Sequence, residues 1–304
     1  MSDVALLVPC YQAARFLPAF TSELRVLTRS FSETYFYDDG STDSTVSLAA
    51  SLGIPLIRGE VNQGVSHARN QLAQTSKAEW LHFHDVDDPI VPDFLALMEP
   101  LLGGNTDVAV CDTDWLSEDQ TEHLINYRYA SGAWADPLLT NLRAGISCNG
   151  MIVRRSVFLS VGGFDPSLRM WEDADLHVRL AAAGARYAGL GAVAAKSVRR
   201  AASFSHDYRA SWNWRLHALE SYGQKLPARV HSEVANQSEI AARHLLRHGD
   251  KVAAERALAL NHRMGGNAPE TSNALLHLAR RFLSPLNTLR IQEAIRRISP
   301  RKIG

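Results

Sequence analysis

The sequence predicts an α/β protein with a mostly parallel central sheet flanked by helices, followed by an α-helical C-terminal region. Through about residue 105, short apolar runs alternate with stretches of helical periodicity, which is typical of βαβ units. From Ser211 onward the pattern is helical almost throughout. We therefore divide the chain into an α/β domain, residues 1–208, and a helical region, residues 209–304.

Three apolar runs that end abruptly in polar residues predict the strands that carry the functional site. They span residues 4–8, 35–37 and 80–83. In an open α/β sheet, ligands bind outside the carboxyl ends of the strands, so three such ends predict one shared crevice. The residues that follow the three runs are Pro9 and Tyr11, Asp38 and Asp39, and Asp85, Asp87 and Asp88.

The other elements follow from periodicity, caps and breakers. We expect helices at residues 45–50 (capped by Ser41 or Thr42), 64–75, 92–102 and 172–183, further strands at 54–57, 108–111 and 150–153, and loop and strand at 189–198. Residues 117–145 are polar and irregular, which favours a surface excursion. In the helical region we expect helices at 245–260, 273–282 and 287–298.

The amino-acid composition limits the classes of protein to which this chain can belong. The chain has 304 residues, 46% of them hydrophobic and 21% charged, as in a soluble globular protein. Its three cysteines lie far apart, so neither a disulfide framework nor a zinc site is indicated, and a reducing cytoplasm fits. There is no 18-residue apolar stretch and no signal-peptide pattern, so we expect a cytoplasmic protein without a membrane span.

The aspartate cluster formed by Asp85, Asp87 and Asp88 concentrates three like charges at one strand end. Their repulsion is tolerated where a cation or a polar ligand offsets it. On an extended backbone Asp85 and Asp87 point to the same side and can face one ligand. An isolated D-x-D is more often an acidic surface turn, and Asp112 with Asp114 forms a second such pair. The two other polar strand ends favour the ligand site.

Five motifs, in this order along residues 4–205, resemble those of family 2 glycosyltransferases. They are V-P-C-Y at 8–11, D-D-G-S-T-D at 38–43, N-Q-G-V-S-H-A-R-N at 62–70, D-V-D-D at 85–88, and G-G-F-D at 162–165 with E-D-A-D-L at 172–176. The resemblance implies the GT-A fold of nucleotide-diphospho-sugar transferases. It also implies inverting, non-processive transfer of a sugar from a nucleotide diphosphate sugar, with UDP favoured, and a requirement for Mn²⁺ or Mg²⁺. The acceptor would be a hydroxyl of a saccharide or a lipid-linked molecule, as in cell-surface polysaccharide biosynthesis.

The same resemblance assigns the donor-binding residues. Asp39 would accept a hydrogen bond from a base N–H, and Pro9 and Tyr11 would frame the base. Arg69 would lie near the base or the phosphates, where a guanidinium fork suits phosphate. Simpler alternatives stay open: Asp39 capping the following helix, Tyr11 ending a buried strand, and Arg69 pairing with the aspartate cluster.

The metal and the catalytic base are assigned in the same way. Asp87 and Asp88 would bind the divalent cation, with Asp85 at the ribose or sugar. Asp173 would be the general base that takes the proton of the acceptor hydroxyl, and Glu172 would orient it or bind the acceptor. The alternative is that these two acids only complement the dipole of a helix start.

Two residues depart from the family pattern. Gln12 stands where the family usually has Asn, and Arg200 stands near the place of a His that often ligates the metal. Because Arg cannot ligate a metal, we expect Arg200 to neutralise the donor diphosphate directly.

The C-terminal region is basic. Residues 1–210 contain 17 Lys and Arg against 25 Asp and Glu, which leaves 15 against 7 for residues 211–304. Apolar and basic residues interleave through 275–304, a pattern that fits either peripheral contact with an anionic membrane or a helical contact within the protein or a homodimer. Nucleic-acid binding is disfavoured, since no recognition motif accompanies the charges.

Three other functions are alternatives to glycosyl transfer. A glycoside hydrolase also uses paired carboxylates but needs no nucleotide pocket. A nucleotidyltransferase usually needs a phosphate-binding glycine-rich loop after its first strand, where this chain has Pro9-Cys10-Tyr11-Gln12. A non-catalytic nucleotide-sugar or glycan-binding module would be favoured by loss of Asp173 or of the aspartate cluster, and both are present.

Overall fold

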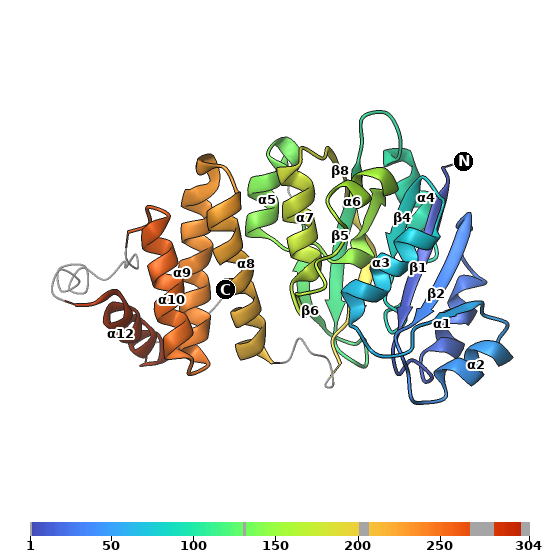
Figure 1. Ribbon diagram of the computed structural model, residues 1–304, viewed down its shortest axis with the longest axis horizontal. Coiled ribbons are helices and arrows are strands. Elements are labelled where there is room, and N and C mark those ends of the chain that lie inside the picture. The colour runs from blue at the N-terminus through green and yellow to red at the C-terminus, as the bar shows by residue number, and fades with distance from the viewer. Residues whose placement is uncertain (1, 130–131, 201–206, 268–282, 299–304) are drawn as a thin grey trace. The chain divides into compact units, whose positions relative to one another are not determined.

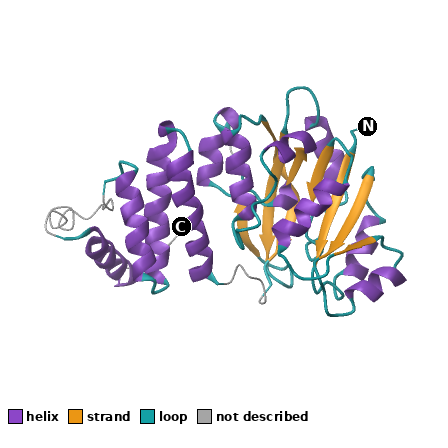
Figure 2. Ribbon diagram, in the orientation of Figure 1, coloured by secondary structure: helices purple, strands orange, loops and turns teal. Residues whose placement is uncertain are grey.

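The computed structural model describes residues 2–129, 132–200, 207–267 and 283–298. The chain divides into two compact units, Met1–Ser203 and Phe204–Gly304. The described strands all belong to the first unit, and the described part of the second unit is helical (Figures 1 and 2).

The first unit is built on an eight-stranded sheet in the order β3-β2-β1-β4-β7-β5-β6, with β8 also paired to β5. Strands β1 to β4 are mutually parallel, as predicted, whereas β7 runs antiparallel to both β4 and β5, and β6 runs antiparallel to β5. The sheet is therefore mixed. The strands are β1 Val4–Cys10, β2 Glu33–Asp38, β3 Leu56–Arg58, β4 Trp80–Phe83, β5 Val108–Leu116, β6 His123–Tyr127, β7 Met151–Arg154 and β8 Tyr187–Val198.

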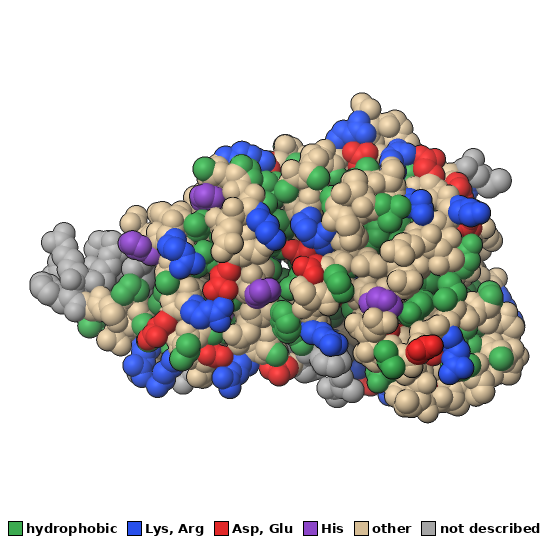
Figure 3. All heavy atoms as spheres, viewed as in Figure 1, with side chains coloured by type: hydrophobic (Ala, Val, Ile, Leu, Met, Phe, Trp, Pro, Cys, Tyr) green, Lys and Arg blue, Asp and Glu red, His purple; other side chains and the backbone are tan. Residues whose placement is uncertain are grey.

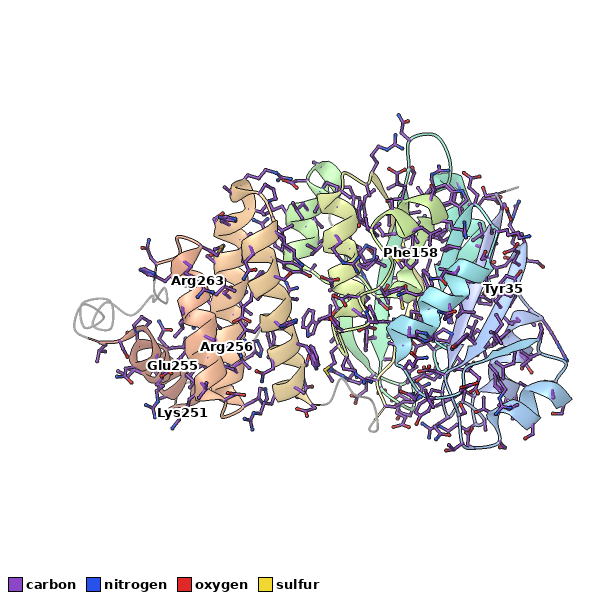
Figure 4. All side chains as sticks on the ribbon, viewed as in Figure 1. Tyr35, Phe158, Lys251, Glu255, Arg256 and Arg263 are labelled. Carbon is purple, nitrogen blue, oxygen red and sulfur yellow. The ribbon has the colours of Figure 1, made fainter. Side chains whose placement is uncertain are left out.

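Helices cover both faces of this sheet (Figure 2). They are α1 Leu17–Leu24, α2 Thr45–Ser51, α3 Val65–Thr75, α4 Phe94–Met98, α5 Pro137–Arg143, α6 Arg155–Ser160 and α7 Glu172–Ala182, with short 3-10 turns at Glu99–Leu101, Ala133–Ala135 and Cys148–Gly150. In one core, Phe158 of α6 (Figure 4) and Phe164 pack on Phe83, with ring centroids 5.2 and 5.1 Å away. This aromatic cluster fixes the Gly162–Asp165 turn next to the end of β4.

Two local predictions for this unit were wrong. Residues 117–145 do not form an irregular excursion: β6 pairs with β5, and α5 begins where Asp136 accepts a hydrogen bond from the Leu139 N–H. The cap predicted for α2 is absent, because the Ser41 and Thr42 hydroxyls accept hydrogen bonds from Gln12 and the cap position belongs to Ser44. A hairpin with β5 and a local cap explain the first error, whereas a long-range partner, Gln12, explains the second.

The second unit contains α8 Tyr208–Lys225, α9 His231–Arg247, α10 Lys251–Arg263 and α12 Pro285–Ile298, with a 3-10 turn at Ala228–Val230. The single helix predicted at 245–260 was wrong. Gly249 has a φ of 81°, and the Asp250 side chain caps α10 by accepting from the Ala253 N–H. The helix predicted at 273–282 lies outside the described residues.

Ion pairs link the helices of the second unit. Arg247 of α9 binds Glu293 of α12 at 2.6 Å, and Arg256 of α10 (Figure 4) binds Glu220 of α8 at 2.7 Å. On the face shown in Figure 3, acidic and basic side chains of this unit are interspersed. None of its described helices, nor any in the described part of the first unit, is long and apolar enough to cross a membrane.

Gly40, in the turn after β2, offers a first test of the fold. Its φ is +74°, and a Cβ there would lie 2.7 Å from the carbonyl carbon of Val61. We expect Gly40→Ala to lower the free energy of unfolding by about 3 kcal/mol, from left-handed strain and a backbone clash together. Gly53→Ala is the matched control, with a φ of +70° and no atom within 4 Å, and should cost only about 1 kcal/mol. Equal losses in urea denaturation would contradict the predicted clash.

Candidate functional site

The strand ends predicted to meet do lie side by side. β1 is hydrogen-bonded between β2 and β4 in parallel, so all three carboxyl ends open on one edge of the sheet (Figure 1). The first residues beyond the strands continue the pairing. The Asp39 N–H donates to the Cys10 carbonyl at 2.8 Å, and the His84 N–H donates to the Leu7 carbonyl at 3.0 Å. This alignment carries the acidic motifs of β2 and β4 to either side of Tyr11.

Gln12, the first departure from the family pattern, joins two of these ends. It adopts the left-handed conformation, with φ of 51°. Its N–H and its side-chain amide donate to the hydroxyls of Ser41 and Thr42, both at 2.9 Å, and its side-chain oxygen accepts from the Asp43 N–H at 3.0 Å. The longer side chain thus ties the turn after β1 to the turn after β2.

Asp39 binds the loop before α3 and does not cap α2. Its carboxylate accepts hydrogen bonds from the N–H groups of Gln63, at 3.1 Å, and Gly64, at 2.7 Å. The residue is 3% exposed, whereas Tyr11 is 50% exposed and so is not a buried strand end. Pro9 lies buried within β1. Asp39 therefore holds the D-D-G-S and N-Q-G motifs together at the rim where Tyr11 exposes its ring.

Arg69 joins the end of β4 to the start of α7. Its guanidinium, in a residue only 3% exposed, lies 2.6 Å from an Asp85 oxygen and 2.9 Å from a Glu172 oxygen. It also lies over the ring of Phe164, 5.2 Å from the ring centroid. The simpler alternative, an ion pair with the aspartate cluster, is what the structure shows for this residue. The ion pair of Arg69 with Glu172 joins residues that are 103 positions apart in the sequence.

Asp87 and Asp88 face Arg200, which approaches from the end of β8. The Arg200 guanidinium lies 2.8 Å from an Asp87 oxygen and 3.7 Å from an Asp88 oxygen, and it also donates to the Asp87 carbonyl. Burial, and then the charges of Asp85 and Asp87, raise the pKa of Asp88 to about 8. Burial and the charge of Asp85 also raise the pKa of Asp87 against the opposing effect of Arg200. Arg200 alone therefore does not offset the negative charge gathered at the end of β4.

The donor atoms at this end suit a divalent cation. Mg²⁺ and Mn²⁺ take oxygen ligands and are commonly held by one or two carboxylates plus substrate phosphates. Asp87 exposes 37% of its side chain, whereas the Asp88 carboxylate already accepts from the Val198 N–H and from the Asn149 amide. Within the described ranges, no three Asp, Glu, His or Cys side chains form a metal-ligand set. The residues present therefore fit a site completed by phosphate oxygens, with Asp87 the better-placed ligand.

Asn149 is a site residue that sequence reasoning missed. Its side chain is buried, accepts a hydrogen bond from the Asp85 N–H at 3.1 Å, and donates to Asp88 and to the Ser197 hydroxyl. It lies in a 3-10 turn before β7, and no local signal marks it. Because it touches two of the three clustered aspartates, it sets their spacing.

Asp173 lies in the first turn of α7, which starts after Trp171 in a left-handed conformation with φ of 67°. Burial, and then the charge of Glu172, raise the pKa of Asp173 to about 7, although Arg69 acts in the opposite direction. Acids that only complement a helix dipole are normally exposed and keep an ordinary pKa. A carboxylate poised near neutrality is suited to accept a proton. Tyr127 of β6, also missed, lies close by: burial, and then the charge of Asp173, raise the pKa of its hydroxyl.

The sheet is mixed and carries polar residues at three adjacent strand ends, and Arg69 joins these ends to the acidic start of α7. This combination defines a glycosyltransferase domain of the GT-A fold. The comparison with known families agrees with this class. The model of glycosyl transferase family 2 matches residues 5–158, half of the chain, and the protein belongs to that family.

Known proteins add relatives and structural neighbours. An uncharacterized glycosyltransferase of Haemophilus influenzae is 28% identical over 184 residues, which cover 58% of this chain and 61% of the relative. The chain thus matches less than two thirds of that relative's length. The structure resembles S. aureus TarS 1-349 in complex with UDP-GlcNAc (TM-score 0.58, 12% identity, 90% of this chain and 95% of that one). It also resembles the mannosyltransferase PcManGT of Pyrobaculum calidifontis with GDP-Man and Mn²⁺ (TM-score 0.60, 16% identity, 99% and 88%). At such identities the structural likeness shows the fold.

Proposed function

We propose that the protein transfers a sugar, with inversion, from a nucleotide diphosphate sugar to a hydroxyl of a saccharide or lipid-linked acceptor. The observation that carries this proposal is the Arg69 bridge. It joins Asp85, at the end of β4, to Glu172, next to Asp173, so one buried cation couples the donor-side aspartates to the candidate base. Such coupling suits a displacement in which a diphosphate leaves on one side and a proton is removed on the other.

The base of the donor would bind at Pro9, Tyr11 and Asp39. Tyr11 presents an exposed ring that can stack on the base, and Asp39 offers a carboxylate at the same rim. Family resemblance favours UDP. The fold-level neighbours that bind UDP-GlcNAc and GDP-Man support a nucleotide sugar as the donor class.

Asp87 and Arg200 would receive the diphosphate. A bound Mn²⁺ or Mg²⁺ would neutralise the charge that develops on the leaving group. Asp87 would hold that cation, with Asp88 as the second predicted ligand and Asp85 directed to the ribose or sugar. Arg200, which rests on Asp87 at 2.8 Å and over the ring of Phe16, would pair with phosphate oxygens.

Asp173 would act as the general base. Its raised pKa lets it take the acceptor proton near neutral pH, and Glu172, held by Arg69, would orient it or bind the acceptor. An acceptor of a cell-surface polysaccharide pathway, in a cytoplasmic setting, stays a prediction from the sequence.

The C-terminal contact also stays a prediction, because 268–282 and 299–304 lie outside the described residues. In the described part of 275–304, helix α12 exposes Arg290, Ile291 and Ile295. This mixture of basic and apolar side chains suits either peripheral contact with an anionic membrane or contact with a second copy of the chain.

Calorimetric titration with UDP, GDP and dTDP, with and without Mn²⁺, tests the donor site. We expect UDP to bind in a Mn²⁺-dependent way and Asp87→Ala to weaken binding at least about 10-fold, because one metal ligand and the partner of Arg200 are lost. Asp93→Ala is the control, since Asp93 is exposed and its side chain caps nothing. Absence of nucleotide binding in the wild type would overturn the proposed function and favour a glycan-binding module or a hydrolase.

A further inference from the structure

Arg169 lies at the rim of the site without a protein partner. It belongs to the loop between the Gly162–Asp165 turn and α7, and it is exposed. Within the part of the chain that the structure describes, its guanidinium makes no hydrogen bond or ion pair. One guanidinium nitrogen lies over Gly64, 3.6 Å from where a Cβ of that residue would be. An unpaired cation placed against a binding loop is a candidate ligand contact.

The loop that carries Arg169 is anchored on both sides. Leu168, which precedes it, is buried and donates its N–H to the Asp165 carbonyl at 3.2 Å. Trp171, which follows, starts α7 in the left-handed conformation. These constraints hold the backbone of Arg169 within reach of Gly64.

Arg169 lies next to the backbone N–H groups that bind Asp39. The Gly64 N–H that donates to Asp39 at 2.7 Å belongs to the residue beneath the guanidinium. Asp39 accepts from two backbone N–H groups and lies 4.0 Å from His67 Nδ1, which leaves part of the acceptor capacity of a carboxylate. Asp39 and Arg169 form no ion pair in the described structure, so the guanidinium keeps its donors. A hydrogen-bond acceptor and a hydrogen-bond donor therefore lie close together at one rim.

The order of the strands in the sheet indicates which part of the donor would bind to Asp39 and Arg169. Asp39 follows β2 and the aspartate cluster follows β4, with β1 between them. Two strand spacings place the ends about 10 Å apart. The diphosphate belongs at the β4 end, near Arg200, and the carboxylate of Asp39 would repel a phosphate at the β2 end. A neutral group with an N–H beside a C=O fits an acceptor and a donor at the β2 end.

We propose that Arg169 donates a hydrogen bond to the carbonyl of the donor's base, next to the imino N–H that Asp39 accepts. The pair would select keto bases, namely uracil, thymine or guanine. Cytosine and adenine would turn a ring-nitrogen acceptor toward the carboxylate, which leaves Asp39 without a donor, and adenine has no carbonyl for the guanidinium. This inference rests on the proposed function and adds the group that would set base specificity.

The test compares Arg169→Ala with wild type for binding of UDP, CDP and inorganic pyrophosphate in the presence of Mn²⁺. We expect the variant to bind UDP about 10- to 100-fold more weakly, as for loss of a charged hydrogen-bond donor. Pyrophosphate should bind as before, and the preference for UDP over CDP should narrow. Arg25→Ala, at an exposed arginine after α1, is the matched control and should change none of these affinities.

Two results would overturn the inference. An equal loss of UDP and pyrophosphate affinity would make Arg169 a phosphate contact, and unchanged UDP affinity would make it a bystander. Failure of wild type to bind any nucleotide would instead count against the proposed function, so the two failures are distinguishable.

Discussion

Asp173→Asn is expected to lower kcat by about 10²- to 10⁴-fold, the usual contribution of a general base. The amide keeps the size of the side chain but cannot accept the acceptor proton. Binding of UDP should stay within about 2-fold of wild type, because the proposed donor contacts lie at the β2 and β4 ends. Initial rates of UDP release, measured with a UDP-sugar and a saccharide acceptor panel, beside calorimetry, separate the two effects.

The pH profile of the wild type gives an independent check of the same residue. Because the pKa of Asp173 is raised to about 7, the base is protonated below that pH and active above it. We therefore expect log(kcat/KM) to rise with unit slope toward pH 7 and then level off. Asp173→Asn should abolish this rise of log(kcat/KM) with pH, and Asp93→Asn should preserve it. A variant of Asp173 that retains wild-type turnover would refute its role as base.

Arg69→Met should lower the free energy of unfolding about as much as Gly40→Ala. Truncating a buried cation leaves Asp85 and Glu172 as like charges without their shared partner, and breaking such a pair typically costs 3–5 kcal/mol. Since Asp85 exposes 33% of its side chain, water relieves part of the cost, and we expect about 3 kcal/mol in urea denaturation. Activity should also fall below detection, because the variant loses the contact that orients Glu172.

Arg186→Met provides the matched control. Arg186 pairs with Asp107 at 2.8 Å through a side chain that is 53% exposed, so water can replace the lost contact and the variant should lose far less stability than Arg69→Met. Adding Glu172→Gln to Arg69→Met should recover part of the lost stability, because one uncompensated charge is removed. If Arg69→Met unfolded at the same urea concentration as Arg186→Met, the bridge would not be the stabilising element that we infer.

Local patterns were sufficient for the parallel half of the sheet. Each of β1, β2 and β4 is an apolar run that stops at polar residues, and parallel pairing then places those residues at one edge. Local patterns failed for β7 and β6. The β4 partner of β7 lies about 70 residues away in the sequence, whereas β6 pairs with its neighbour β5, and an apolar run does not specify the direction of the strand it joins.

The sequence alone determined the fold class, the family resemblance and the identity of most candidate site residues, since these depend on residue types at short spacings. Tertiary structure alone decided how those residues act on one another. The bridge of Arg69 to Glu172 joins positions 103 residues apart, and Asn149 and Arg169 enter the site without any local signal. The pKa of Asp173 is raised chiefly by burial, and burial exists only once distant segments have packed together and excluded water.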